Sequence, residues 1–104
     1  MSTCISFTVT LFMAGDYAHA KQLVNRWVAD NPMCFSMVPV DYVYTFGCEA
    51  GFRLDAINYP RFPTDEATKR AMVEALAEHL MIELNQRSYT IQGTAETTFF
   101  GRRT

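Results

Sequence analysis

The stretch VPVDYVYTFGCEAGFRLDAINY, residues 38–59, decides the fold that the sequence predicts. Apolar residues alternate on both sides of the segment GCEAG (47–51), and this pattern predicts a β-hairpin with 47–51 as its loop. Pairing Phe46 with Phe52 makes the apolar side chains of both strands share one face, and a slip of one residue would destroy this agreement. In that register the side chains of the first strand that point toward the core are Val38, Val40, Tyr42, Tyr44 and Phe46.

Elements on either side of the hairpin complete the pattern. Alternation predicts strands at 4–13, 88–92 and 97–100, and helical spacing predicts helices at 17–30 and 65–86. Asp16 and Thr64 are the expected N-caps, and Lys69 is expected on the outer face of the second helix.

The order β-α-β-β-α-β resembles the ferredoxin-like arrangement. We therefore expect an α+β fold: one four-stranded antiparallel sheet with two helices on one face, and room for an extra short C-terminal strand. Residues 1–104 are expected to form a single domain.

Composition excludes several classes of function. The formal net charge is −2, with nine basic residues among 104. This balance disfavours nucleic-acid binding, which relies on clustered Lys and Arg contacts to phosphate. Three cysteines without a CxxC spacing favour neither a zinc site nor a disulfide framework. No stretch reaches about 18 unbroken apolar residues, so we expect no membrane span and a cytoplasmic location.

Candidate chemistry is sparse in this sequence. His79 and Glu83 have the i,i+4 spacing that can hold a metal, but no further ligand stands at a predictable distance along the chain. No P-loop or GxGxxG segment is present, and no serine or threonine has an identifiable base partner. The sequence therefore predicts no catalytic residue, no cofactor and no metal.

The open face of the sheet and the segment NYPRFP (58–63) are the better candidates for binding. A sheet with both helices on one side leaves its other face uncovered. We expect Arg53, Asp55 and Tyr59 on that face, and Arg61 at the exit of the third strand. Arginine and tyrosine are enriched at protein interfaces, so these four residues are the predicted partner-binding set. Phe62 is expected to pack beneath the second helix.

Two functions from different classes remain open. The first is a small non-enzymatic protein-interaction or regulatory module that binds a protein partner and could form a homodimer through its sheet face or edge. NYPRFP also resembles segments of small uncharacterised bacteriophage proteins, and that resemblance implies inhibition of a host or defence protein. The alternative is a small-molecule-binding or enzymatic domain with a pocket at a dimeric sheet face, lined by Thr8, Thr10, Arg53, Asp55 and Tyr59.

Overall fold

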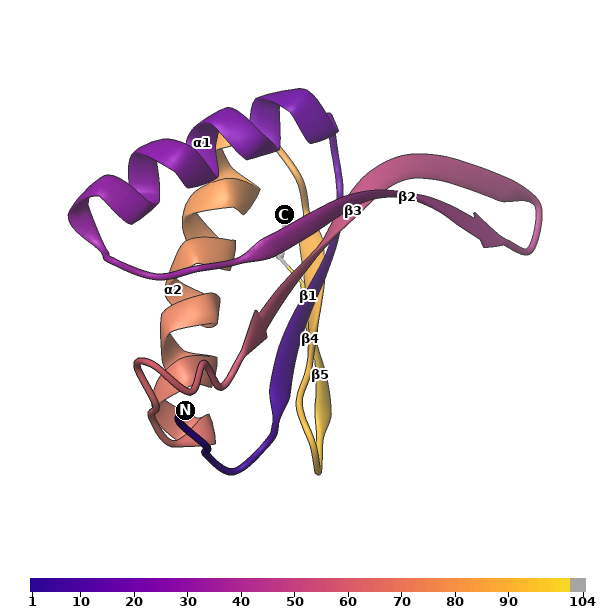
Figure 1. The fold of residues 1–104 in the computed structure, drawn as a ribbon. Helices are drawn as coiled ribbons and strands as arrows, with labels where there is room; N and C mark the ends of the chain where they lie inside the picture. The colour runs from indigo at the N-terminus through magenta and orange to yellow at the C-terminus, as the bar shows by residue number, and fades with distance from the viewer. Residues whose placement is uncertain (102–104) are drawn as a thin grey trace.

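A computed structural model describes residues 1–101 of the chain. It contains five strands and two helices within these residues (Figure 1). In chain order they are β1 (Thr8–Ala14), α1 (Tyr17–Asp30), β2 (Ser36–Tyr44), β3 (Gly47–Ile57), α2 (Glu66–Glu83), β4 (Ser88–Gln92) and β5 (Thr97–Gly101).

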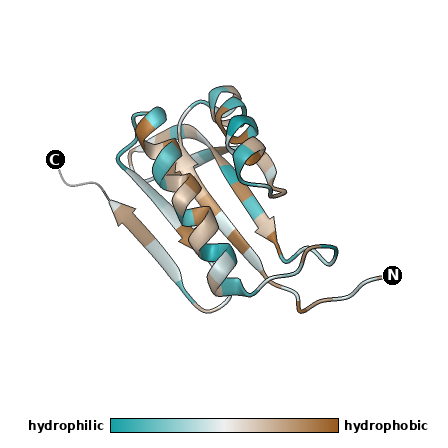
Figure 2. Ribbon diagram, turned by 90° about the vertical axis from the view of Figure 1, so that its left-hand side faces the viewer, coloured by the Kyte–Doolittle hydropathy of each residue, from teal (hydrophilic) through white to brown (hydrophobic). Residues whose placement is uncertain are grey.

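The strands form one antiparallel sheet in the order β2-β3-β1-β4-β5. Both helices cover the same face of this sheet, and the other face is left open (Figures 1 and 2). The first four strands have the predicted ferredoxin-like order, and β5 adds a fifth strand beside β4. The predicted α+β class is confirmed, and β2, which contains Pro39, lies at an edge as a strand proline requires.

The core lies between the sheet and the helices. Alternate residues of β1, β3 and β4 point into it, as the period of a strand dictates. They meet the apolar stripes of α1 and α2. The largest fully buried side chains are Phe52, Leu11, Met13, Leu54, Leu76, Leu80, Ile91, Val9 and Val73.

Side-chain caps and backbone turns define the ends of the helices. The carboxylate of Asp16 accepts a hydrogen bond from the backbone N–H of His19 at the start of α1, as predicted. At α2 the cap is Asp65, not Thr64, because its carboxylate accepts from the N–H of Thr68. The cap that binds the free backbone N–H groups of the first turn of α2 therefore lies one residue later than expected.

The hairpin register differs from the predicted one. Tyr44 pairs with Gly47, so the turn consists of Thr45 and Phe46, and the segment 47–51 belongs to β3. Tyr42 faces Glu49 instead of Ala56. In the predicted register the numbers of two paired residues add up to 98, and in the structure they add up to 91. Because the difference is odd, every side chain of β2 points to the opposite face of the sheet from the predicted one.

The β2–β3 hairpin continues beyond the body of the molecule. In Figure 1 its far half projects away from the helices and from the other strands. We call this part, residues 40–50, the arm. Its side chains Val43, Tyr44 and Phe46 are exposed, because neither helix reaches them.

Buried Asn58 fastens the N-terminal segment to the loop after β3. Its side-chain amide donates a hydrogen bond to the carbonyl of Ile5 at 2.7 Å, and its amide oxygen accepts from the N–H of Thr64 at 3.0 Å. The backbone N–H of Asn58 also donates to the carbonyl of Phe7 at 3.0 Å. One side chain therefore holds two segments that are distant in sequence.

Candidate functional site

Polar side chains form a hydrogen-bonded group on the open face of the sheet. The carboxylate of Asp55 accepts from the Thr10 hydroxyl at 2.7 Å and forms an ion pair with the Arg53 Nε at 3.0 Å. Thr10 and Asp55 are direct cross-strand partners in the β1–β3 ladder. Arg53 and Asp55 thus lie together on the predicted face, and they satisfy each other.

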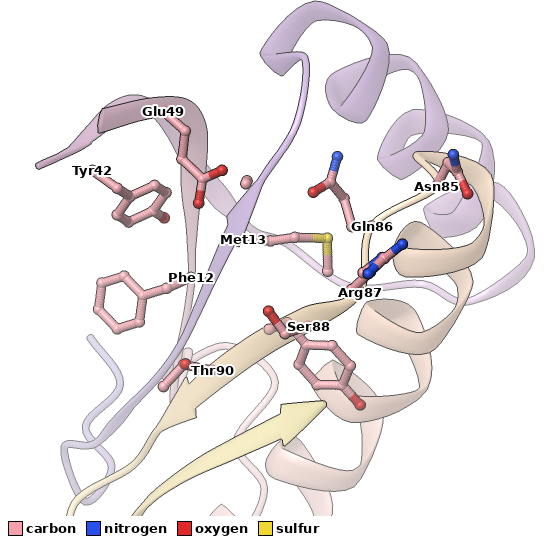
Figure 3. A pocket seen from close by; sticks show the side chains of 11 residues that line it. Phe12, Met13, Tyr42, Glu49, Asn85, Gln86, Arg87, Ser88 and Thr90 are labelled. Carbon is pink, nitrogen blue, oxygen red and sulfur yellow. The ribbon is translucent and has the colours of Figure 1, made fainter. Parts of the chain in front are cut away.

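A cavity of about 470 Å³ lies where the end of β1, the base of the arm and the α2–β4 connection meet. Figure 3 shows Phe12, Tyr42 and Glu49 on one side of β1, and Gln86 and Arg87 on the other. The residues that line it are Phe12, Met13, Ala14, Tyr42, Glu49, Asn85, Gln86, Arg87, Ser88, Tyr89 and Thr90. Its volume falls in the range of small-molecule sites.

The end of α2 positions Arg87, the positively charged residue of the cavity lining. Asn85 has a φ of 53°, a left-handed conformation that asparagine tolerates better than most residues. The N–H of Gln86 donates to the carbonyl of Met81, and that of Asn85 to the carbonyl of Ile82. This is a Schellman ending, which turns the chain sharply. Gln86 and Arg87 are thereby directed to the cavity rim.

Tyr42 forms the aromatic wall on the arm side. Its hydroxyl donates to the carbonyl of Phe52 at 2.6 Å, and burial raises the pKa of this phenol above its ordinary value. The ring also covers Gly51, where a Cβ would lie 2.5 Å from the Tyr42 Cε2 atom and would meet the carbonyl oxygen of Met13. Glycine at position 51 therefore allows the ring to lie flat on the strand.

Charge in the cavity is divided between two sides. Glu49 is the carboxylate among the lining residues and Arg87 is the guanidinium. They do not form an ion pair with each other, since the ion pair found within residues 1–101 is that of Arg53 and Asp55. The lining of the cavity therefore includes a negative group, a positive group and three aromatic rings, those of Phe12, Tyr42 and Tyr89.

The four predicted partner-binding residues are not brought together. Arg53 and Asp55 lie on the open face outside the cavity lining. Tyr59 and Arg61 line a different hollow, beside the helices, so Tyr59 does not continue the open face as expected. Phe62 does not pack beneath α2, because it is largely exposed.

Sequence reasoning missed the residues of the cavity itself. The sequence predicts a loop at Glu49 and a core position for Tyr42, whereas the structure pairs the two residues across β2 and β3. Phe12 on the polar side of the first strand was a usable signal, because an aromatic ring there has no core to enter.

Other sites considered from the sequence have structural explanations or are unsupported. The His79 ring packs on Trp27, with centroids 5.2 Å apart. No group of three or more His, Cys, Asp or Glu residues within positions 1–101 is arranged to hold a metal ion. In the same range, neither helix is long and apolar enough to cross a membrane.

Comparison with known proteins gives a structural likeness. No protein-family model matches the chain, and no curated protein sequence matches it. Its fold is similar to a phage SAM lyase in the apo state, with a TM-score of 0.69 and 13% identity over 94% of this chain and 90% of the other. It is also similar to a phage SAM lyase in complex with S-methyl-5′-thioadenosine, with a TM-score of 0.61 and 10% identity over 97% and 93% of the two chains.

At these identities the likeness establishes a shared fold. Both neighbours are phage proteins, which is compatible with the resemblance of NYPRFP to small phage proteins. Both are also enzymes, and this finding contradicts the expected non-enzymatic interaction module. The alternative, a small-molecule-binding or enzymatic domain, agrees better with the neighbours and with the cavity.

Proposed function

We propose that this chain is a small enzyme that binds S-adenosylmethionine, or a closely related nucleoside sulfonium, in the cavity of Figure 3. The observation that carries the proposal is the lining of that cavity: one carboxylate, one guanidinium and three aromatic rings around about 470 Å³. The similarity in fold to phage SAM lyases supports the choice of substrate class.

Each part of such a substrate has a chemical counterpart in the lining. A sulfonium cation is attracted to a carboxylate and to aromatic faces, which Glu49, Phe12 and Tyr42 supply. The carboxylate of the amino-acid part suits a guanidinium such as Arg87, whose planar donors match it. The adenine ring can stack on an aromatic side chain.

Cleavage in this class of reaction breaks the bond between sulfur and the amino-acid chain. The bonding electrons go to sulfur, and neutral S-methyl-5′-thioadenosine leaves. The vacated carbon is closed by the substrate's own carboxylate oxygen, or a neighbouring carbon gives up a proton to form a double bond. Ring closure needs no protein base, whereas elimination needs one, and Glu49 is the carboxylate that lines the cavity. Such a metabolite would be met in the cytoplasm, and we keep that location as part of the proposal.

Binding measurements on three variants test the assignment. Glu49→Gln and Arg87→Met are expected to weaken S-adenosylmethionine binding at least about tenfold, roughly 1.4 kcal/mol. Neither is expected to change S-methyl-5′-thioadenosine binding, because that product lacks both the sulfonium charge and the carboxylate. Phe12→Ala is expected to weaken both ligands.

Matched controls are available outside the cavity. Glu83→Gln and Arg26→Met carry the same chemical changes at exposed positions and are expected to leave both affinities unchanged. Calorimetry measures the affinities, and chromatography measures thioadenosine release. The proposal is wrong if the wild-type chain binds neither nucleoside, or if the cavity variants behave like the controls.

We also propose that a second copy of the chain covers the open face and closes the cavity. Apolar side chains are exposed on the open face, namely Val38, Tyr44, Ile57 and Phe99, and Phe46 is exposed at the tip of the arm. Phe46 has a φ of 68°, a left-handed conformation that a bulky residue adopts at a cost of about 1–2 kcal/mol. A strained aromatic at an exposed tip is consistent with a contact to another chain.

Oligomeric state tests this second proposal. Light scattering is expected to give a multiple of 11.9 kDa for the wild type and a smaller mass for Phe46→Gly. The glycine variant relieves the left-handed strain, so a loss of assembly would not reflect unfolding. A monomeric wild type at working concentrations would refute it.

A further inference from the structure

A second hollow lies on the helix-covered side of the molecule and shares no residue with the proposed sulfonium cavity. Its volume is about 680 Å³, and it is enclosed by the end of α1, the α1–β2 connection, the loop after β3 and the start of α2. Its lining residues are Val28, Pro32, Met33, Cys34, Tyr59, Arg61, Phe62, Thr64, Lys69 and Met72.

Lys69 is the unusual residue of this hollow. Its sequence position predicted an exposed side chain, yet only 7% of its surface is accessible. No hydrogen bond or ion pair within residues 1–101 involves its ammonium group. Buried lysines are rare unless paired, because removing an ammonium from water is costly.

The Lys69 ammonium keeps some access to solvent. Among the described residues, the Tyr89 hydroxyl is the side-chain polar atom that has no hydrogen-bond partner and no contact with solvent. The Lys69 nitrogen also has no partner, but it is not enclosed in this way. Since Lys69 lines the hollow, we take the hollow as the space to which its charge is presented.

The rest of the lining provides a pair of stacked aromatic rings and a second cation. The rings of Tyr59 and Phe62 are stacked, with centroids 6.4 Å apart and planes at 19°. The Arg61 guanidinium lies 5.6 Å from the centre of the Phe62 ring. No aspartate or glutamate lines the hollow, although the whole chain is acidic.

We propose that this hollow binds a planar organic anion, an aromatic ring system that carries a carboxylate or a phosphate. The anion pairs with the Lys69 ammonium, Arg61 adds a second positive charge, and the ring lies against Tyr59 and Phe62. An opposite charge supplied by the ligand explains why the ammonium has no partner within the chain. The site shares no lining residue with the sulfonium cavity.

Two cysteines provide a position-specific reporter for this site. Cys34 lines the hollow and is exposed, whereas Cys48 is exposed on the arm. A ligand in the hollow is expected to slow alkylation of Cys34 by N-ethylmaleimide at least about threefold and to leave Cys48 unchanged, as measured by peptide mass spectrometry. The probes are 1-naphthoate and adenosine 5′-monophosphate, with 1-naphthylmethanol and adenosine as their neutral counterparts.

Affinities measured by calorimetry are expected to favour each anion over its neutral counterpart by about tenfold or more. Lys69→Met keeps the length of the side chain and removes its charge, so this preference should disappear. Lys21→Met, the same change at the exposed Lys21 of α1, is expected to retain it. The two probes separate a carboxylate ligand from a phosphate ligand.

Thermal stability separates a binding role from a structural one. Removing an unpaired buried charge is expected to leave the melting temperature of Lys69→Met equal to or above that of the wild type. Arg61→Met, in the loop after β3, gives a second variant with reduced anion preference.

Several results would overturn the proposal. They are the absence of Cys34 protection at millimolar probe, equal protection of Cys48, an anion preference that survives in Lys69→Met, or a lower melting temperature of that variant. A change in the molar mass of Lys69→Met would also overturn it, because the partner of the ammonium would then be a second copy of the chain.

Discussion

Replacing Asn58 by alanine tests how the N-terminal segment and the loop after β3 are held. Only 7% of the surface of Asn58 is accessible, and its side chain makes two hydrogen bonds, to the carbonyl of Ile5 and from the N–H of Thr64. Alanine removes both and leaves a carbonyl and an N–H without their partner.

The magnitude follows from the surroundings of those two groups. An unpaired buried group costs about 1–3 kcal/mol, and the lower end applies here because Ile5 is exposed and Thr64 is half-buried. We therefore expect Asn58→Ala to lower the free energy of unfolding by about 2–3 kcal/mol. Asn25→Ala on the exposed side of α1 is the matched control, and we expect it to change stability by less than about 0.5 kcal/mol.

Asn58→Asp separates hydrogen bonding from packing. Its carboxylate can still accept from Thr64, but when ionised it cannot donate to Ile5, so two oxygens face each other. We expect a larger loss of stability at pH 7 than near pH 3, where the protonated acid can donate. Urea denaturation followed by circular dichroism measures both variants. A loss below about 0.5 kcal/mol for Asn58→Ala would refute the reasoning.

Two further predictions concern α2 and β4. Asn85 has a φ of 53°, a conformation that glycine adopts freely and alanine does not. Asn85→Gly is therefore expected to keep or raise the melting temperature, and Asn85→Ala to lower the free energy of unfolding by about 1 kcal/mol. Equal melting temperatures for the two variants would contradict this. Burial, followed by the negative charges of Glu78 and Glu74, raises the pKa of Tyr89, so the folded phenol stays protonated where the unfolded one ionises. Stability should therefore fall as the pH rises above about 10, and urea denaturation should show a shallower fall for Tyr89→Phe; identical slopes would exclude Tyr89 as the cause.

Local signals in the sequence were sufficient for most of the fold. Helical spacing, the Asp16 cap and clean alternation in β1 each act over a few residues, so α1, β1 and the layer order could be predicted. The turn of the hairpin could not be. A two-residue turn with a left-handed residue is normally marked by Gly or Asn, and here that residue is Phe46. The glycines at 47 and 51 instead accommodate the rings of Tyr44 and Tyr42.

The candidate site was harder to predict than the fold. Arg53 and Asp55 could be placed on the open face because they belong to a strand with a clear period. Glu49 and Arg87 are separated by 38 positions, and they line the same cavity only because of the arm and the Schellman ending of α2. The sequence predicts an exposed Lys69 because a charged residue in a helix usually faces water, and only the tertiary structure shows that this side chain is buried.

The arm has a consequence for the dynamics of the cavity. A two-stranded ribbon without a third strand or a helix is marginally stable in water, so residues 40–50 should be the least stable part of the sheet. Among the strands, amide hydrogen exchange should be fastest there and slowest in β1. Because Tyr42 and Glu49 belong to this part, a ligand in the cavity must order the arm as it binds. Part of its binding energy is then used for local folding, and occupancy would be visible as slower exchange along the whole ribbon.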